Sequence, residues 1–437
     1  MQVLKFGGTS VGTPQRMKDV CKLITADGRQ KLVVLSAMSG TTNSLVEISD
    51  YYYKNNPEGA IHIVAQLEKK YMEHVEELYA TAQYKETTRT MLKGVFDLLR
   101  SMAKVHFTSI EEKIVLAQGE LMSTNMVTNY LLENGAKTIL LPALEMVKTD
   151  KNAEPDTAYI REKSRKTMDE NPDYQIYITQ GFICRNAYDE VDNLQRGGSD
   201  YTACLLGAAL EAEEIQIWTD IDGMHNNDPR IVEGTEPVRQ LNFDEAAELA
   251  YFGAKILHPT CIQPAKFAGV PVRLLNTMEP TAPGTIINND FIPGKIKAVA
   301  ARDGNVCIQI TSSRMLLAYG FLRKVFEIFE QNKTPIDMIC TSEVGVSVTI
   351  DNVTRLEEIV SELKKYGTVQ VERDMVIVCV VGDLRPQNFG FESLASEAFK
   401  NIPVRMISYG GSCHNISFLV KKDDKKATLQ ALSKVLF

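Results

Sequence analysis

Short β-forming apolar runs alternate with long helix-period segments up to about residue 290 of this 437-residue chain. In the segments between the runs, apolar residues recur every three or four positions, as at Val64, Leu67, Tyr71 and Val75. This alternation predicts βαβ units and an α/β fold with a mainly parallel sheet sandwiched by helices. Such a sheet binds ligands at the carboxyl ends of its strands. We expect strands at Gln2–Phe6, Lys31–Ala37, Thr138–Pro142, Tyr174–Thr179, Glu214–Thr219 and Val270–Leu275.

The pattern changes after Pro280–Gly294, whose three prolines and two glycines predict a linker or edge loop. The tail beyond it contains two similar halves. Ile336–Ile339 aligns with Val404–Ile407, 68 residues later, and a polar turn, a strand and a helix follow each. We expect two ferredoxin-like βαββαβ units. The predicted domains are residues 1–293 and 294–437, with the first repeat at about 305–375 and the second at about 376–437.

Composition excludes several classes of protein. The net charge of −8 leaves no basic excess for a nucleic-acid or anionic-membrane partner. The eight cysteines are scattered without a C-x-x-C, so we expect reduced thiols and neither a disulfide framework nor a zinc site. The chain starts directly with a strand-like run and contains no apolar run of about 18 residues, which predicts a cytoplasmic protein without a signal peptide.

The first expected strand runs into two consecutive glycines in the segment Lys5–Ser10. Paired glycines allow a tight turn that presents N–H groups to an anion, and Lys5 is placed to meet the β- and γ-phosphates of a nucleotide. A Walker P-loop is excluded, because Thr13 and Pro14 follow Gly12 where that motif requires Lys and Ser or Thr. Taken alone, the segment is also typical of an ordinary glycine turn.

A second glycine pair lies in Leu194–Asp200, ahead of an expected helix. We expect Ser199 or Asp200 to cap this helix, while the glycines leave its first N–H groups open to an anion. Arg196 adds a planar fork that suits a carboxylate. A capped helix start without a ligand is the alternative interpretation.

Charged residues also follow later elements. Acidic groups in Trp218–Gly223 suit a nucleotide, a lysine or Mg²⁺, and equally suit an ordinary turn. Lys255, near the end of an expected helix, is by itself typical of a solvated cation at a helix C-terminus.

In chain order the sequence contains KFGGTSVG, SAMSGTTN, QGELMS, GFICRN with LQRGGSDYTA, WTDIDG with DPR, and AELAYFGAKILHP. In combination these motifs resemble the amino-acid kinase family, most closely its single-function, lysine-sensitive aspartate kinases. The resemblance covers the whole chain, because the tail resembles the tandem ACT modules of those enzymes. It implies the amino-acid kinase fold followed by two ACT modules. It also implies use of ATP with Mg²⁺ to convert L-aspartate to 4-phospho-L-aspartate, the first step of lysine, threonine and methionine biosynthesis.

The resemblance also implies roles for individual residues. Lys5 lies across the transferring phosphoryl group, and Glu120 pairs with the substrate ammonium. His225 stands where the family commonly has an aromatic residue, which bears on adenine packing. No protein side chain is expected to form a metal site. The implied catalytic residues are Lys5, Asp200 and Arg196; the aspartate-binding residues are Ser36, Thr42, Glu120, Arg196 and Ser199; the ATP-binding residues are Lys5, Gly7, Gly8, Ser10, Thr219, Asp220, His225, Arg230 and Lys255.

The implied reaction makes few chemical demands. The carboxylate of aspartate is already ionised near neutral pH, so neither a general base nor an enzyme nucleophile is needed. Catalysis then consists of positioning and charge neutralisation.

The tail is expected to sense an amino acid, and its modules are expected to join a homodimer or homotetramer. Asp337 and Glu343 favour lysine over threonine, because two ammonium groups neutralise two carboxylates. The alternative is that both are solvated turn residues. The implied effector-binding residues are Met315, Gly320, Phe321, Leu322, Asp337, Ser342 and Glu343.

Two other functions remain open. One is a kinase of the same fold that acts on glutamate or acetylglutamate, which leaves the tandem tail unexplained. The other is a catalytically silent amino-acid sensor, which predicts loss of Lys5, Arg196 or Asp200, yet all three are present. Homoserine dehydrogenase activity is not expected, because no G-x-G-x-x-G fingerprint occurs.

Overall fold

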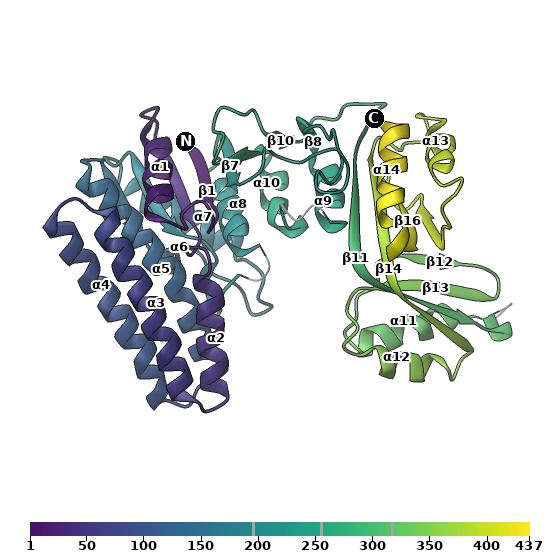
Figure 1. Ribbon diagram of the computed structural model, residues 1–437, viewed down its shortest axis with the longest axis horizontal. Helices are drawn as coiled ribbons and strands as arrows, with labels where there is room; N and C mark the ends of the chain where they lie inside the picture. Colours follow the sequence, from purple (N-terminus) through teal and green to yellow (C-terminus); the bar gives the residue numbers. More distant parts are fainter. Residues whose placement is uncertain (195–196, 254–256, 316–318) are drawn as a thin grey trace. The chain divides into compact units, whose positions relative to one another are not determined.

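The computed structural model describes residues 1–194, 197–253, 257–315 and 319–437 (Figure 1). These residues form two compact units, which are described separately. No helix in the described part of the chain has the length and apolar character needed to cross a membrane. The first unit is Met1–Met224 with Ile256–Asn289, and the second is His225–Lys255 with Asp290–Phe437.

The second unit includes a segment, His225–Lys255, that the sequence analysis placed in the first domain. Hydrogen bonds explain its placement. The Asn226 carbonyl accepts from the Val299 N–H at 2.8 Å, and the Asn227 side chain donates to the Leu429 carbonyl at 3.0 Å. The domain bounds at 293 and 294 stay a prediction.

A mainly parallel sheet forms the centre of the first unit, as predicted. Its strands follow the order β3-β4-β2-β1-β7-β9-β10, and only β10 pairs antiparallel among the pairings of these seven. Every residue of β2 and β4 is buried, because helices cover both faces. The bounds are β1 Gln2–Phe6, β2 Lys31–Leu35, β3 Thr138–Leu141, β4 Ile176–Gln180, β7 Glu214–Thr219, β9 Val272–Asn276 and β10 Thr285–Asn288, with a separate hairpin of β5 Ile183–Arg185 and β6 Val191–Asn193.

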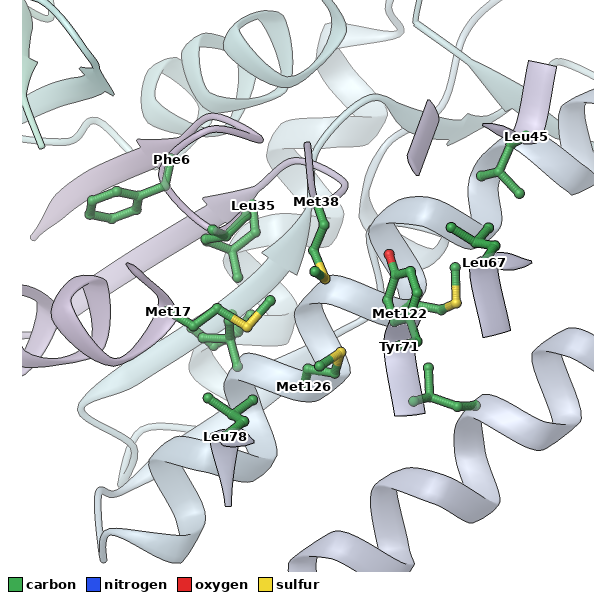
Figure 2. Packing of buried hydrophobic residues seen from close by; sticks show 14 of the residues in the cluster. Phe6, Met17, Leu35, Met38, Leu45, Leu67, Tyr71, Leu78, Met122 and Met126 are labelled. Carbon is green, nitrogen blue, oxygen red and sulfur yellow. The ribbon is translucent and has the colours of Figure 1, made fainter. Parts of the chain in front are cut away.

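Long helices pack against this sheet and against one another. Figure 2 shows Tyr71 and Leu78 of α3 in one apolar cluster with Met122 and Met126 of α5. The three- and four-residue spacing noted in the sequence therefore marks the buried face of α3. The bounds are α1 Pro14–Thr25, α2 Thr41–Tyr53, α3 Pro57–Leu78, α4 Ala82–Ser101, α5 Ser109–Glu133, α6 Ala143–Met146, α7 Thr157–Asp169, α8 Gly198–Ala209 and α10 Gln263–Ala268.

In the second unit, two long strands, β11 and β14, run side by side through a sheet of order β12-β13-β11-β14-β16-β15 (Figure 1). One apolar core lies under α11 and α12, and another under α13 and α14. The bounds are β8 Gln240–Asn242, α9 Phe243–Tyr251, β11 Ile296–Thr311, α11 Phe321–Gln331, β12 Ile339–Thr341, β13 Gly345–Ile350, α12 Leu356–Leu363, β14 Thr368–Gly382, α13 Phe391–Ala398, β15 Met406–Tyr409, β16 Asn415–Lys421 and α14 Lys425–Leu436.

The two predicted ferredoxin-like modules share β11 and β14. A bulge between Arg302 and Cys307 breaks the register of the pair. Beyond the bulge, Cys307–Thr311 pairs with Thr368–Glu372 inside the first module. Before it, residues 296–302 pair with residues 377–382 and so supply the fourth strand of the second module, beside β14, β16 and β15. The first module is therefore inserted into the second, which the simple tandem boundaries at 305–375 and 376–437 do not express.

A buried ion pair crosses the second unit at this bulge. The Arg302 guanidinium lies 2.6 Å from Asp337, whose side chain is 1% exposed. The Tyr251 hydroxyl donates to the other oxygen of Asp337 at 2.5 Å, and the guanidinium lies 4.8 Å from the Tyr251 ring centroid. The end of α9 is thus held to the first module by one carboxylate.

We predict that Arg302→Met lowers the free energy of unfolding of the second unit by about 3–5 kcal/mol, because it leaves the Asp337 charge buried and unpaired. Urea unfolding measures the loss. The matched control is Arg323→Met, which removes an exposed pair with Glu327 on α11 and is expected to cost less than about 1 kcal/mol. Equal losses in the two variants would contradict the burial argument.

Candidate active site and effector region

The segments that follow β1, β2 and β4 lie together at one edge of the first unit's sheet. Parallel strands place their carboxyl ends at the same edge. The Ser36 N–H donates to the Phe6 carbonyl at 3.2 Å, and the Gly181 N–H donates to the Leu35 carbonyl at 2.9 Å. Three of the glycine-bearing segments noted in the sequence are therefore neighbours in space.

Two of the predicted catalytic residues form an ion pair at this edge. Lys5 Nζ, from β1, lies 2.8 Å from the carboxylate of Asp200, in the first turn of α8. Their side chains are 12% and 14% exposed, so a ligand can reach the pair although most of its surface is covered. A lysine held by a carboxylate at a strand end is suited to lie across a phosphoryl group.

The glycine pair after β1 lets two loops approach closely. A Cβ on Gly8 would lie 2.7 Å from the Ala37 carbonyl oxygen, which no side chain tolerates. The Ser39 N–H donates to the Gly8 carbonyl at 3.1 Å, and Gly7 faces Lys5 Nζ. Ser10, also expected at the phosphates, has a buried hydroxyl that shares a 2.8 Å hydrogen bond with Thr277, and its role in ATP binding stays a prediction.

Helix α8 begins at Gly198, with Gly197 as its N-cap in the left-handed region at φ +75°. The expectation that Ser199 or Asp200 caps the helix is wrong, since both lie in its first turn. No side-chain cap bond is present among the described residues, so the N–H groups of this turn suit an anion. A Cβ on Gly181 would lie 2.5 Å from Ser199 Oγ, so this glycine sets the position of the serine.

Phe182, which was not among the predicted site residues, adopts a left-handed backbone with φ +67°. A bulky residue in this region costs about 1–3 kcal/mol and is characteristic of functional sites. Its N–H donates to Thr202 Oγ1 at 3.0 Å, and it packs where a Cβ on Gly198 would lie. The motif GFICRN pointed to the segment, but no propensity identifies a strained phenylalanine within it.

Glu120 of α5 carries a buried carboxylate at the same edge. Its Oε1 accepts from the Ala37 N–H at 3.1 Å, while Oε2 is buried with no hydrogen-bond partner among the described residues. Burial raises the pKa of Glu120 to about 7, against the opposing effects of the Ala37 N–H and the charge of Lys5. A buried, partnerless carboxylate oxygen matches the role expected for pairing with an ammonium group.

The other predicted aspartate-binding residues flank this carboxylate. Thr42 is exposed in the first turn of α2, which begins after Gly40 at φ +83°. The Ser36 carbonyl accepts from Ser123 Oγ of α5 at 2.8 Å. Ser36 and Thr42 therefore lie at the two ends of the segment, residues 36–42, that contacts Glu120 through Ala37.

The predicted ATP-binding residues divide between the units. In the first unit Thr219 ends β7 and Asp220 directly follows it, and the Thr219 carbonyl accepts from the Thr277 N–H at 2.8 Å. His225 and Arg230 belong to the second unit. There Arg230 pairs with Asp228 at 2.8 Å and the His225 ring bonds Thr235 at 3.1 Å. Arg196 and Lys255 lie outside the described residues.

The predicted effector residues lie in the first module. One of them, Asp337, does not fit the charge argument that favoured lysine over threonine. Asp337 is neither solvated nor open, because Arg302 already neutralises it. Glu343 is exposed, so it is the carboxylate of the two that faces solvent. Phe321 belongs to the module's apolar core and Met315 packs against that core. Gly320 caps α11, Leu322 is 38% exposed, and Ser342 forms a turn with Gly345.

Comparison with known proteins shows which families the sequence of this chain matches. The model of the amino acid kinase family matches residues 1–276, and an ACT domain model matches residues 378–436. Over the full chain, the sequence is 35% identical to aspartokinase 3 of Arabidopsis thaliana, covering 81% of that protein. It is 32% identical to lysine-sensitive aspartokinase 3 of Escherichia coli, covering 99% of that protein.

Solved structures agree with this placement. The structure of E. coli aspartokinase III in complex with aspartate and ADP, an R-state, matches with a TM-score of 0.86 at 31% identity over both whole chains. The T-state of that enzyme, in complex with lysine and aspartate, matches with a TM-score of 0.83 at 32% identity, covering 100% of this chain and 99% of the other. The chain therefore belongs to the amino acid kinase family and, within it, to the aspartokinases.

Proposed function

We propose that the protein transfers the γ-phosphoryl group of ATP to the side-chain carboxylate of L-aspartate, giving 4-phospho-L-aspartate and ADP. The observation that carries this proposal is the buried Oε2 of Glu120 at the sheet edge that holds the Lys5–Asp200 pair. Lys5 already pairs with Asp200, whereas Oε2 of Glu120 has no hydrogen-bond partner among the described residues, so it suits the ammonium of an amino acid. The aspartate and ADP bound to the similar E. coli enzyme support the assignment.

The proposed step needs no proton transfer. A carboxylate oxygen of aspartate bonds to the γ-phosphorus as the bond to the β–γ bridging oxygen breaks, and ADP leaves with the electron pair. Lys5 neutralises charge on the phosphoryl oxygens, while Asp200 holds the lysine in place at 2.8 Å. The N–H groups of the first turn of α8 and the exposed Thr42 hydroxyl receive the substrate's carboxylates, together with Arg196.

Mg²⁺ fits this site as a companion of ATP. No group of three or more His, Cys, Asp or Glu side chains suited to a metal occurs in the described part of the chain. Mg²⁺ is commonly held by substrate phosphates with one or two carboxylates. Asp200, which has an oxygen directed at Lys5, and Asp220 at the end of β7 are the carboxylates at this edge that suit that role. When bound, Mg²⁺ would offset the negative charge of the β- and γ-phosphates.

Lysine is the proposed effector, acting from the first module. Support comes from the exposed Glu343 beside the turn of Ser342, and from the lysine complex of the E. coli enzyme. Inhibition requires that two states of the enzyme bind lysine unequally. Assembly through the ACT modules as a dimer or tetramer, and a cytoplasmic location, stay predictions.

Lys5→Ala is expected to lower kcat at least about 100-fold, because one phosphate-stabilising charge contributes roughly 3 kcal/mol in the transition state. Acyl phosphate trapped with hydroxylamine reports turnover. The control is Lys31→Ala, which removes another buried lysine paired with an aspartate, Asp27, at the amino end of β2. It is expected to lower stability while kcat stays within about threefold. A near-wild-type kcat in Lys5→Ala would refute the assigned role.

The KM for aspartate is expected to rise about tenfold per pH unit below about pH 7, because Glu120 must be ionised to pair with the ammonium and its pKa is about 7. The KM for ATP should change little over the same range. Glu120→Gln should give a high KM for aspartate that no longer depends on pH in this interval. A pH dependence that survives in Glu120→Gln would assign the titration to another group, and equal rises in both KM values would refute the ammonium role.

Glu343→Ala is expected to raise the lysine concentration for half-inhibition at least about fivefold, with uninhibited activity unchanged, since typical coupling energies are about 1–3 kcal/mol. Glu330→Ala removes an exposed charge from α11 of the same module and should leave inhibition as it was. Wild-type enzyme indifferent to millimolar lysine would refute the effector. Inhibition by threonine instead would keep the sensor and refute the charge argument.

A further inference from the structure

Three elements hold the loop of residues 36–42, which carries the proposed aspartate-binding Ser36 and Thr42. The glycine turn that follows β1 is the first, since its Gly8 carbonyl accepts a hydrogen bond from the Ser39 N–H at 3.1 Å. Helix α5 accepts from the Ala37 N–H through Glu120. The third element is α3, and neither the sequence motifs nor the proposed mechanism uses it.

Helix α3 reaches this loop with two consecutive side chains. Lys70 Nζ donates to the Ser39 carbonyl at 3.2 Å. The Tyr71 hydroxyl shares a 2.9 Å hydrogen bond with the Thr41 hydroxyl, and both residues are 0% exposed. Figure 2 shows Tyr71 among apolar side chains of the core, with Met122 and Leu67 labelled nearby. A hydroxyl buried in such surroundings costs free energy unless it is bonded, so this bond constrains where Thr41 lies.

The position of Thr41 affects two of the proposed aspartate-binding residues, Thr42 and Glu120. Thr41 is the first residue of α2 and directly precedes Thr42. A Cβ on Gly119 would lie 2.7 Å from Ala37 Cβ and 3.5 Å from Thr41 Cγ2, so α5 packs directly on this loop one residue before Glu120. A shift of Thr41 therefore moves Thr42 and disturbs the packing of Ala37 against α5, where the Ala37 N–H donates to the Glu120 carboxylate.

We propose that Tyr71 is a positioning residue for aspartate binding, whose hydroxyl fixes the loop 36–42 against Glu120 through Thr41. The proposal rests on the aspartate site proposed above. Burial raises the pKa of Tyr71 well above its ordinary value, and the Glu120 charge adds to the rise, so the phenol stays protonated and its hydrogen bond persists across the working pH range.

Tyr71→Phe is the direct test, because phenylalanine fills the same space and removes only the hydroxyl. Its KM for aspartate is expected to rise about five- to twentyfold, while the KM for ATP stays within twofold. The matched control is Tyr79→Phe, at the end of the same helix, where a buried hydroxyl donates to the Met126 carbonyl at 2.7 Å away from the loop. Both variants lose one buried hydrogen bond and should lose similar thermal stability, but only Tyr71→Phe should change aspartate binding.

Thr41 supplies a second, independent arm. Thr41→Ser keeps the hydroxyl and should keep the KM for aspartate near wild type. Thr41→Val removes it and should reproduce Tyr71→Phe, with no further rise in the double variant, because both changes break one bond. This serine–valine pair decides the matter if Tyr71→Phe does not fold.

Three results would overturn the proposal. They are a wild-type KM for aspartate in Tyr71→Phe, an equal rise in Tyr79→Phe, or parallel rises in the KM values for aspartate and ATP. Glu120→Gln, assayed alongside, tests the proposed aspartate site separately from the positioning role of Tyr71. If Glu120→Gln leaves the aspartate KM unchanged, the aspartate site itself is misplaced, whereas a large rise there with none in Tyr71→Phe rejects only the positioning role.

Discussion

The ion pair between Lys5 and Asp200 joins the central strand of the first unit to the helix whose N-terminus opens at the same edge. Taking a lysine largely out of water is costly unless a counter-charge accompanies it. Asp200 supplies that charge from the first turn of α8, so the sheet and the helix must close on each other for the pair to form. The fold that buries the pair thereby brings the glycine turn and the helix N–H groups to one place.

Close backbone approaches extend this constraint outward. Gly8 contacts the Ala37 carbonyl, Gly119 contacts the Ala37 side chain, and Gly181 contacts Ser199. At each of the three glycines a Cβ atom would clash with that neighbour. The segments are consequently packed as one body, in which Glu120 lies buried and one of its oxygens has no hydrogen-bond partner among the described residues. Holding that carboxylate away from water raises its pKa, and an arriving ammonium group would recover part of the cost. A site prepared in this way favours a zwitterionic amino acid over a simple carboxylic acid.

Much of this architecture could be predicted from the sequence, because strand and helix periods are local and the motifs follow the strands. The expected Glu214–Thr219 strand, for example, matches β7 in full. Contacts between distant segments could not be predicted in the same way. In the sequence, Tyr71 is one of several apolar positions on the buried face of α3, and Asp337 has the character of a carboxylate in a turn. Their partners, Thr41 and Arg302, are set by packing that no local pattern encodes.

Asp337 also links the first module to the end of α9, because β11 and β14 are shared by the two modules of the second unit. Because β11 serves both modules, the bulge at Arg302 is the point where the first module joins the second. Arg302 contacts Asp337 on the first module and the rings of Tyr251 and Phe252 at the end of α9. A Cβ on Gly253 would lie 2.3 Å from the Ala301 carbonyl oxygen, so Gly253, two residues after α9, packs directly against β11. Any ligand that displaces Asp337 must therefore disturb the segment that leads into the FGAKILHP motif.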